Sequence, residues 1–406
     1  MAWRNVWRNP RRSILTILAI AFATTTLIFM LSWQFGSYET MINSAVKLHT
    51  GHLQIQAKEY RDKKNIRLTV NSPKAVGRVL ENTPGVAAYT FRANAFSMVS
   101  SEKRTYGALV SGIDPLREAS VSSLKDLIRK GSYLSADDTN QAMVGRLLAK
   151  NLQVDLGDEL VLLGQGRDGS IAATVVEVKG IFSSGQDEFD RQTIHIPLLF
   201  FQQVYTMAGT VHNVVVFGES LDHVPQIKRS VKTVLKNQSD MNGLSVLDWT
   251  ELMPGLIEAI KMDLVSGFVF YIILIIVVAF SILNTFLMAI FERTREFGVL
   301  MAIGTTPGRL TKCLLLESAS ITMLGILVGI VAGSLITWYF QVHGIVISGT
   351  SELLRQYGLP ERIYPQLSCL SVSIGAGIVS IITLLTALYP SFRVKRLRPV
   401  EAMLAV

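Results

Sequence analysis

Four long runs without Asp, Glu, Lys or Arg interrupt the otherwise mixed pattern of apolar and polar residues along the chain. Each run has at least 23 residues, and about 20 apolar residues suffice to cross a bilayer as an α-helix. The first run exceeds the roughly 7–15 residues of a signal-peptide core and has no A-x-A-like cleavage site after it, which favours a retained anchor. The pattern therefore predicts four transmembrane helices. Their uncharged runs are 13–35, 264–291, 318–342 and 363–392, and we extend the third helix toward the N-terminus so that it spans 313–342.

Composition supports a membrane protein. Of the 406 residues, 49% are hydrophobic and only 17% are charged, whereas soluble domains have roughly 25% charged residues. High hydrophobicity with little charge also excludes a disordered chain. The two cysteines cannot form a disulfide framework, and the six histidines show no zinc-site spacing, so we predict no metal site.

Positive charge is concentrated in three short segments. Residues 1–12, 292–317 and 393–406 together hold the whole formal net charge of +8, while the segments 36–263 and 343–362 are each neutral overall. Because short loops rich in Lys and Arg stay in the cytoplasm, we expect both termini inside the cell and the two neutral segments outside. This topology explains the basic balance, so we expect membrane lipid and no nucleic acid among the partners.

The segment 36–263 is large enough to bury a core of its own, and its pattern is mixed α/β. Alternating residues and runs of Val, Ile and Leu predict strands, and a Ser-Pro start followed by helical spacing predicts a helix. We expect two subdomains, because the strand-rich middle is flanked by two strand-plus-helix units. The predicted strands are 51–56, 105–113, 159–163, 172–181 and 213–217, and the predicted helices are 72–82 and 224–237.

Two motifs in this segment have the residue types of ligand sites. The run from Gly164 to Ser170 has the glycine spacing of a phosphate loop but lacks its lysine, which favours a hairpin turn. Asp187, Glu188 and Asp190 are Ca²⁺-type ligands, but we interpret them as a solvated loop. No nucleophile–base arrangement is recognisable, so we predict no catalytic residue and no enzyme activity in this chain.

Two amphipathic segments are predicted on the cytoplasmic side. In the N-terminal helix 1–12, Trp3 and Trp7 share one face and should lie at the level of the lipid headgroups. In the region 292–312, a charged turn precedes an apolar stripe, and Gly304 and Pro307-Gly308 end the helix. The stripe consists of Phe297, Val299, Leu300 and Ile303. It needs a partner, which is either the bilayer surface or a soluble subunit.

The run from Asn284 to Gly304, NTFLMAIFERTREFGVLMAIG, closely resembles the signature of the FtsX/MacB/LolC-LolE (type VII) ABC transporter permeases. The resemblance continues through the N-terminal WRNVWRNPRR, the LLLE at 314–317 and the basic tail, and covers nearly the whole chain. The motifs GHLQI at 51–55, GIDP at 112–115 and GIFSSG at 180–185 are similar to the lipoprotein-releasing branch.

This resemblance implies a permease subunit in the bacterial inner membrane, with a MacB-like periplasmic domain at 36–263, a periplasmic loop at 343–362 and a cytoplasmic tail at 393–406. It implies pairing with a second permease, identical or paralogous, and with an ABC ATPase subunit that binds ATP and Mg²⁺. The chain has no G-x-x-x-x-G-K-[ST] motif, so we expect a separate ATPase and no cofactor here. The resemblance assigns ATPase coupling to Glu292, Arg293, Arg295, Glu296, Gly298 and Gly304.

Helix packing is expected at a second group of residues. Gly325, Gly329 and Gly333 repeat a small-xxx-small pattern that lets helices approach closely, at an intramolecular or a dimer interface. Asn284 is the main polar residue within the predicted helices and should bond across helices. We expect Glu317 to pair locally with Lys312 or Arg309, and the arginines of the coupling region could instead contact lipid headgroups.

The sequence leaves the substrate open. The leading interpretation is release or transport of a lipoprotein from the inner membrane by a moving periplasmic domain. The alternatives are MacB-like efflux of drugs or peptides and FtsX-like regulation of a cell-wall hydrolase. An alternative that is not a transporter is a membrane-anchored sensor without an ATPase, and the coupling motif argues against it.

Overall fold

The computed structural model describes residues 10–236, 241, 243–346 and 362–395, and it separates into two compact units. The membrane unit contains the described residues up to Glu39, from Ala259 to Val346 and from Arg362 onward. The sheet unit contains the described residues from Thr40 to Glu258.

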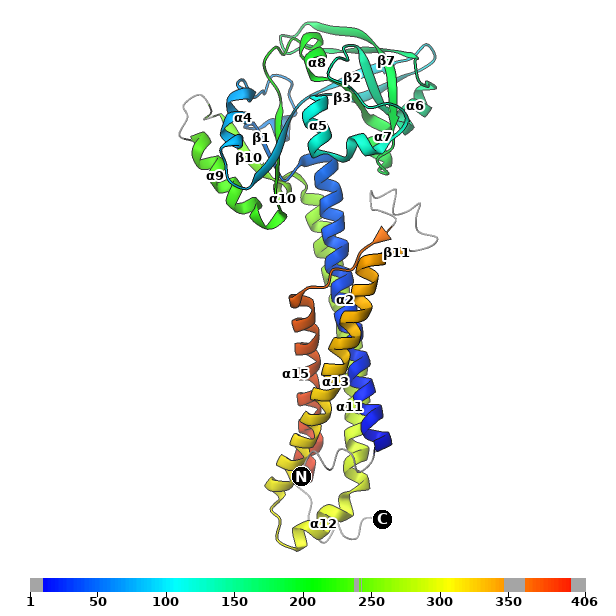
Figure 1. Cartoon of the computed structure of the whole chain (residues 1–406), viewed down its shortest axis with the longest axis vertical. Helices are drawn as coiled ribbons and strands as arrows, with labels where there is room; N and C mark the ends of the chain where they lie inside the picture. The colour runs from blue at the N-terminus through cyan, green and yellow to red at the C-terminus, as the bar shows by residue number, and fades with distance from the viewer. Residues whose placement is uncertain (1–9, 237–240, 242, 347–361, 396–406) are drawn as a thin grey trace. The chain divides into compact units, whose positions relative to one another are not determined.

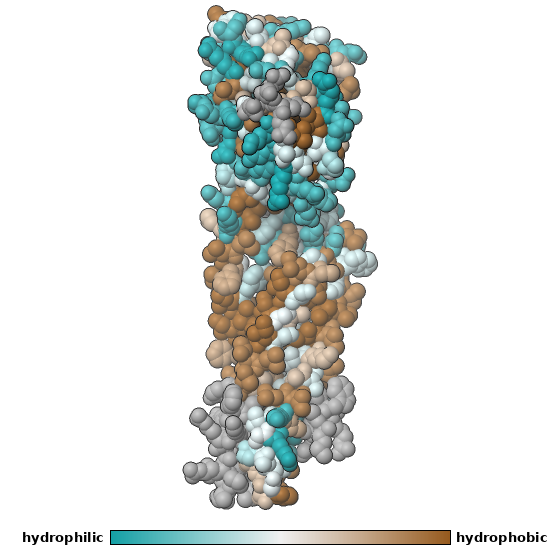
Figure 2. Space-filling model, turned by 90° about the vertical axis from the view of Figure 1, so that its left-hand side faces the viewer, coloured by the Kyte–Doolittle hydropathy of each residue, from teal (hydrophilic) through white to brown (hydrophobic). Residues whose placement is uncertain are grey.

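The membrane unit contains four helices long and apolar enough to cross a bilayer, with mean hydropathies of 2.1–2.8 over their most apolar parts. The first three are longer than their uncharged runs because charged residues at their ends remain helical, whereas the fourth begins six residues after the start of its run. The four helices predicted from the sequence are confirmed, and Figure 2 shows hydrophobic side chains gathered over them. They are α2 (Pro10–Ala45), α11 (Pro254–Glu292), α13 (Pro307–His343) and α15 (Cys369–Lys395); the smaller elements are α12 (Thr294–Ala302), β11 (Ile345–Val346) and β12 (Arg362–Ile363).

Small and polar side chains lie between these helices. A hydrogen bond of 2.9 Å joins the hydroxyls of Ser32 in α2 and Ser371 in α15, and Thr25 donates to the carbonyl of Gly329 at 3.2 Å. A cluster that includes Ile20, Leu27 and Phe286 is also buried there, but many large apolar side chains face outward, as at Val277 and Phe280, which are 61% and 67% exposed. This distribution suits lipid, because apolar surface gains nothing by leaving lipid for a protein interior.

The sheet unit is a mixed α/β domain, as predicted, and it is built on ten connected strands, of which the sequence patterns indicate five. The strands follow the order β10-β1-β9-β2-β3-β8-β5-β7-β4, and β6 pairs with both β2 and β7. Figure 1 shows the long strands β2, β3 and β7 at one end of the unit and β1 and β10 at the other. The strands are β1 (Leu53–Ala57), β2 (Val86–Ser100), β3 (Thr105–Ile113), β4 (Ile128–Gly131), β5 (Gln141–Gly145), β6 (Glu159–Gln165), β7 (Ile171–Phe182), β8 (Thr193–Pro197), β9 (Asn213–Gly218) and β10 (Leu244–Asp248).

Six of these strands close on themselves. The pairings β2-β3, β3-β8, β8-β5, β5-β7, β7-β6 and β6-β2 form a complete circuit, a small barrel. The strands β9, β1 and β10 extend the sheet from the other part of β2. The expected strand-rich middle is therefore the barrel, but it is not a separate subdomain, because the 15 residues of β2 belong to both parts. Sequence patterns missed β2 because it is rich in Ala and contains Arg92 and Asn94, which are poor strand signals.

Helices cover the sheet and complete its core. In α9, Val224, Ile227, Val231 and Leu235 are buried, at the i, i+3 and i+4 spacing of one helical face. They join a large cluster of aliphatic side chains inside the sheet unit, including Val110, Val176 and Ile194, that have no exposed surface. The helical elements of this unit are η1 (Val46–Thr50), α3 (Tyr60–Lys63), α4 (Pro73–Glu81), α5 (Pro115–Val121), η2 (Ser123–Leu127), α6 (Arg146–Leu152), α7 (Asp187–Gln192), α8 (Leu198–Val204), η3 (Leu221–His223), α9 (Val224–Lys236) and α10 (Trp249–Leu252).

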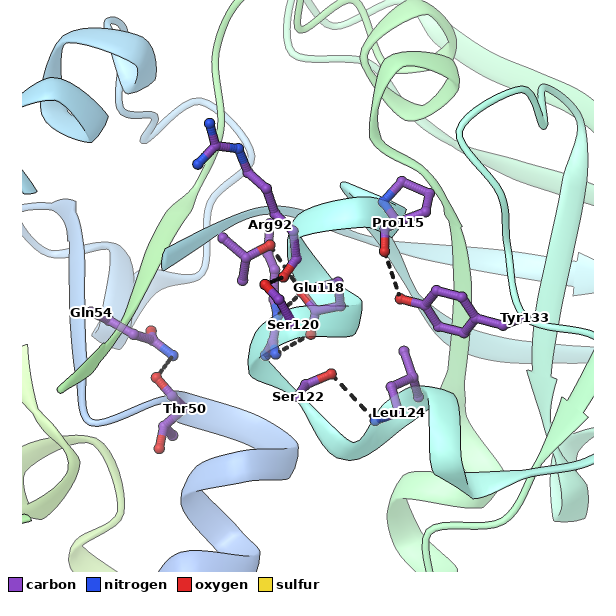
Figure 3. Close-up of polar contacts among 11 residues, drawn as sticks. Thr50, Gln54, Arg92, Pro115, Glu118, Ser120, Ser122, Leu124 and Tyr133 are labelled. Carbon is purple, nitrogen blue, oxygen red and sulfur yellow. Dashed lines mark hydrogen bonds and ion pairs between the residues drawn. The ribbon is translucent and has the colours of Figure 1, made fainter. Parts of the chain in front are cut away.

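A buried ion pair fastens α5 to the sheet (Figure 3). The Arg92 guanidinium on β2 donates to both carboxylate oxygens of Glu118, at 3.1 and 2.5 Å, and Glu118 is 1% exposed. Burial alone would raise the pKa of Glu118, but the Arg92 charge and the hydrogen bonds from Arg92 and Ser122 together outweigh burial and hold that pKa below its usual value. The two-point contact fixes the geometry of α5 against β2.

Candidate functional site

The connection between α11 and α13 is a short amphipathic helix. On one side of α12, Phe297 and Met301 are 3% and 9% exposed and pack against Ile290 of α11 and Leu310 of α13. On the other side, Val299, Leu300 and Ile303 are 45%, 42% and 78% exposed. The predicted apolar stripe is therefore divided. Phe297 faces inward with Met301, because residues four apart share a helical face, and the other three residues face outward.

The end of α12 is a Schellman motif. The amide of Gly304 donates to the carbonyl of Met301 at 3.0 Å, and the amide of Thr305 donates to the carbonyl of Leu300 at 2.9 Å. Gly304 has a φ of 104°, in the left-handed region that favours glycine. Gly304 thus ends the helix, and Pro307 at the first turn of α13 starts the next one.

An ion pair ties the start of α12 to α13. The Arg293 guanidinium donates to the two carboxylate oxygens of Glu317 at 3.3 and 3.2 Å, and it contacts Glu296 at 3.4 Å. The side chains of Arg293 and Glu317 are only 15% and 10% exposed. The expected pairing of Glu317 with Lys312 or Arg309 is therefore wrong. Those residues precede Glu317 on α13, whereas Arg293 approaches from the preceding connection.

The other predicted coupling residues surround this pair. Gly298 is buried beside Phe297, whereas Glu292, Arg295 and Gly304 are exposed and Glu296 is partly exposed. The guanidinium of Arg293 also lies 5.6 Å from the centre of the Phe297 ring. On the exposed side of α12, a charged side chain therefore lies beside apolar ones. We call this surface the outer face of α12; it consists of Arg295, Val299, Leu300 and Ile303.

The three predicted packing glycines lie against α2. A Cβ added to Gly325 would lie 2.7 Å from the Cβ of Ile20, and one added to Gly329 would lie 2.7 Å from the carbonyl oxygen of Ala21. A Cβ at Gly333 would lie 3.2 Å from the Cα of Thr25. The structure places all three at an interface within the chain, where the backbones of α13 and α2 come close.

The predicted polar and interfacial residues have different outcomes. Asn284 lies on an exposed face of α11, and the described residues give its side chain no hydrogen bond to another helix. Trp3 and Trp7 lie outside the described residues. The prediction that these tryptophans lie at the membrane interface stays a prediction.

Sequence reasoning missed a polar cluster that joins α2 to α11. The Tyr38 hydroxyl donates to Asp263 at 2.6 Å, and the Tyr271 hydroxyl donates to Gln34 at 2.8 Å. The Gln34 amide donates to Tyr38 at 2.8 Å, which links the two bonds. Asp263, the last charge before the second apolar run, was the available signal, but a spacing along one helix does not reveal a partner on another.

The two ligand-like motifs of the sheet unit are structural. The run from Gly164 to Ser170 connects β6 and β7 as a hairpin, which confirms the predicted turn. Asp190 is buried and accepts hydrogen bonds from Ser183 and Ser184, at 3.0 Å and 2.6 Å. The predicted solvated loop is therefore wrong for Asp190, which closes its own loop. The described residues contain no cluster of His, Cys, Asp and Glu suited to a metal ion.

Two family models match the chain. The MacB-like periplasmic core domain matches residues 13–234, more than half of the chain, and the FtsX-like permease C-terminal domain matches residues 268–399. The chain is 24% identical to the lipoprotein-releasing system transmembrane protein LolC of Xylella fastidiosa (strain 9a5c), over 96% of this chain and 93% of that protein.

Two further relatives extend the comparison. The uncharacterized ABC transporter permease YknZ of Bacillus subtilis (strain 168) is 23% identical, with coverage of 99% of this chain and 97% of that protein. The macrolide export ATP-binding/permease protein MacB of Hyphomonas neptunium (strain ATCC 15444) is also 23% identical over 99% of this chain, which spans 60% of that longer protein.

Proposed function

This chain belongs to the FtsX-like ABC transporter permeases with a MacB-like periplasmic core domain, and we propose that it couples ATP hydrolysis by a separate ATPase subunit to lipoprotein release. In this proposal, the sheet unit handles a lipoprotein on the periplasmic side of the bacterial inner membrane. Members of the family are permeases that work with ATPase subunits and form dimers. The similarity to LolC over 96% of this chain supports this substrate class.

The observation that carries the coupling role is the outer face of α12. Phe297 and Met301 anchor the helix to the ends of α11 and α13, while Arg295, Leu300 and Ile303 remain exposed. A cationic group beside exposed apolar side chains suits a protein partner better than water, because burying these side chains is favourable. The ion pair between Arg293 and Glu317 would transmit a push on α12 directly to α13.

The proposed orientation places α12, both termini and the tail 393–406 in the cytoplasm. Its support is the concentration of Arg and Lys in the short segments that flank the helices. A fluorescent-protein fusion at the C-terminus should fluoresce, and an alkaline phosphatase fusion at the same position should be inactive. The reverse pattern would contradict the orientation.

The coupling role is tested by recovery of the ATPase. We expect an ABC ATPase to copurify with the tagged chain from its native membranes in mild detergent, at about one copy per chain. The double variant Arg295→Glu with Ile303→Asp should lower this recovery about tenfold or more. It reverses the charge at residue 295, and it introduces a negative charge at residue 303 that the contact with the ATPase would bury. Both side chains are exposed, so the purified variant should keep its thermal stability.

Lys312→Glu is the matched control, because it reverses an exposed charge on α13 outside the outer face of α12. We expect it to retain the ATPase and the ATPase activity of the complex. Equal recovery of the ATPase with the double variant and the control would contradict the coupling role. Absence of an ATPase from an intact preparation of the unmodified chain would favour the membrane-anchored sensor.

Efflux is the second candidate, favoured by the similarity to MacB over 99% of this chain. The two candidates differ in what accompanies the chain on the periplasmic side. Chemical crosslinking in membranes before purification should capture a lipoprotein if the proposed function is right. Reproducible capture of a periplasmic adaptor and an outer-membrane channel, without lipoprotein, would favour efflux.

A further inference from the structure

A cavity of about 740 Å³ opens on one side of the sheet unit, between β1, β2, β9 and α3. Its lining is unusual in two ways. Seven of its side chains are carboxamides, three carry positive charge, and none of the lining residues that the structure describes is Asp or Glu. The carboxamides are Gln54, Gln56, Asn65, Asn94, Gln165, Gln192 and Asn213, and the cations are Arg61, Lys63 and Lys64.

One buried side chain in this lining has an unused hydrogen-bonding atom. Asn213 is only 8% exposed, and its Oδ1 has no hydrogen-bond partner among the residues that the structure describes. Strand pairing places it beside Gln56 of β1, another buried amide of the cavity. A buried acceptor without a donor is costly. A ligand that brings a hydroxyl or an amide N–H to Asn213 would remove that cost.

The floor of the cavity is rigidly held. The Gln54 amide donates to the carbonyl of Thr50 at 3.0 Å (Figure 3). The backbone amide of Asn94 donates to Nδ1 of His212, so the Nε2–H of His212 donates to the carbonyl of Ile66 at 3.0 Å. Tyr60 stacks on this ring at 4.8 Å. The amide groups are therefore presented by fixed elements, which lowers the entropy cost of binding.

The rim of the cavity favours an anion. Lys63 pairs with Glu59 at 2.6 Å and Arg61 contacts Asp62 at 3.5 Å, but both pairs are exposed to solvent. The described residues give Lys64 no acidic partner. Solvent-exposed ion pairs contribute little, so the three cations can turn toward a negatively charged group in the cavity.

An exposed apolar surface begins where the carboxamides end. Asn94, Phe96 and Met98 alternate along β2 and therefore share one face of the sheet. Phe96 is 69% exposed and also lines the cavity. The surface crosses β3, β6 and β7 on the outside of the barrel, since Phe96 pairs with Leu109 and Met98 with Leu163. We call it the barrel apolar face; it consists of Phe96, Met98, Leu109, Val161, Leu163, Ile171 and Val175, each 38% or more exposed.

We propose that the cavity and the barrel apolar face together bind one acylated amphiphile, with its head in the cavity and its acyl chain along the barrel. The head carries an anionic group and hydroxyl or amide N–H donors. On one face of β2, the surface changes from polar at Asn94 to apolar at Phe96. An acylated amphiphile changes in the same way from its polar head to its acyl chain. This site deepens the proposed function, on which it rests, by assigning a contact for lipid-linked cargo.

Direct binding is the first test. The probe is lysophosphatidylglycerol, which combines one acyl chain, a phosphate and a glycerol head group with two hydroxyls, titrated onto the full chain in phosphatidylcholine nanodiscs. We expect it to bind about tenfold more tightly than lysophosphatidylcholine of equal chain length, which lacks the net charge and the two hydroxyls of the head group. A photocrosslinking benzophenone residue in place of Leu163 should attach to the lipid. Equal affinity for the two lipids would overturn the proposal.

Three substitutions test the three parts of the site. Asn213→Leu should weaken binding of lysophosphatidylglycerol about fivefold, and Lys64→Gln about threefold, with a loss that shrinks as salt rises. Phe96→Ser should weaken it about tenfold. The matched controls are Asn140→Leu, Lys232→Gln and Leu199→Ser, exposed residues of the sheet unit outside this cavity. Controls that weaken binding as much as the substitutions would overturn the proposal.

Thermal stability separates binding from folding at Asn213. Because Oδ1 is buried without a partner, Asn213→Leu should keep or raise the unfolding temperature of the free protein. It should nevertheless lose the increase in that temperature that lysophosphatidylglycerol causes in the unmodified chain. An unchanged increase would show that Asn213 does not touch the ligand and would overturn its assignment.

The outcome is independent of the coupling test. Failure of lipid binding, with ATPase recovery intact, would reject this site and leave the coupling role standing. Loss of ATPase recovery from the unmodified chain, with lipid binding intact, would reject the coupling role instead. If the benzophenone at Leu163 captures only polypeptide and no lipid, the barrel apolar face is a protein contact and the proposal is wrong.

Discussion

The two units of the molecule differ in which side chains they leave exposed and in what accompanies the buried aliphatic residues. The sheet unit encloses large aliphatic residues such as Leu148 and Ile194, which have no exposed surface. The membrane unit also buries aliphatic residues such as Ile20, but it encloses Thr24, Ser32 and the packing glycines beside them and turns Phe280 toward its surroundings. Water drives apolar side chains inward, whereas lipid does not, so close backbone contact and hydrogen bonds hold the membrane helices. Truncating an outward-facing apolar side chain of the membrane unit should therefore cost much less stability than truncating a core side chain of the sheet unit.

The largest expected effect comes from truncating a leucine in each unit. Leu148→Ala should destabilise the sheet unit by about 2–5 kcal/mol, because it leaves a cavity in a closed core. Leu327→Ala on α13, where the side chain is 50% exposed, should change stability by less than about 0.5 kcal/mol. Thermal unfolding in detergent measures both, at about 2–4 °C per kcal/mol. Equal shifts for the two variants would contradict the contrast.

This contrast also explains what the sequence could predict. The four long apolar helices and the strands 105–113 and 213–217 were predictable, because they depend on local runs of apolar residues. The pair of Arg293 with Glu317 was not predictable, since it joins two helices through their packing. The amide cavity was missed for the same reason. Gln56 and Asn213 become neighbours only when β1 pairs with β9, and each alone looks like an ordinary polar residue of a strand.

The second effect is a loss of stability at low pH, and it should be confined to the sheet unit. Burial lowers the pKa of His212 to about 4, below the value of about 6.5 expected in the unfolded chain. As the pH falls, His212 therefore takes up a proton in the unfolded state before it does so in the folded state. The free energy of unfolding falls as the pH drops from about 7 to 4. The full loss from this residue is roughly 3 kcal/mol.

His212→Gln tests this expectation, because glutamine keeps a donor and an acceptor but does not titrate. The variant should show a flatter decline of the unfolding temperature between pH 7 and 4 than the unmodified chain. Intrinsic fluorescence, to which Trp249 contributes from the sheet unit, can follow the unfolding. An identical pH dependence in both proteins would show that His212 is already accessible to protons in the folded state.

A smaller effect is expected at the one ion pair described between α12 and α13. Glu317→Gln leaves the Arg293 guanidinium largely shielded from water without its charged partner, at a cost of about 2 kcal/mol. Adding Arg293→Gln should recover part of that loss, so the double variant should be less destabilised than the sum of the single variants. A double-variant cycle of unfolding temperatures measures this coupling. Strict additivity would mean that the two side chains do not interact.

The smallest effect compares two glycines of the membrane unit. Gly329→Ala should destabilise it by about 1–2 kcal/mol, because the new Cβ would lie 2.6 Å from the Cβ of Thr24 and force α13 away from α2. Gly377→Ala meets nothing within 4 Å on α15 and should stabilise its helix by up to about 1 kcal/mol, since alanine is the better helix former. The opposite signs distinguish close backbone packing from helix propensity, and unfolding in detergent measures both. If both variants stabilise the protein, the small residues of α13 are not what holds the helices together, and the contrast between the two units loses its main support.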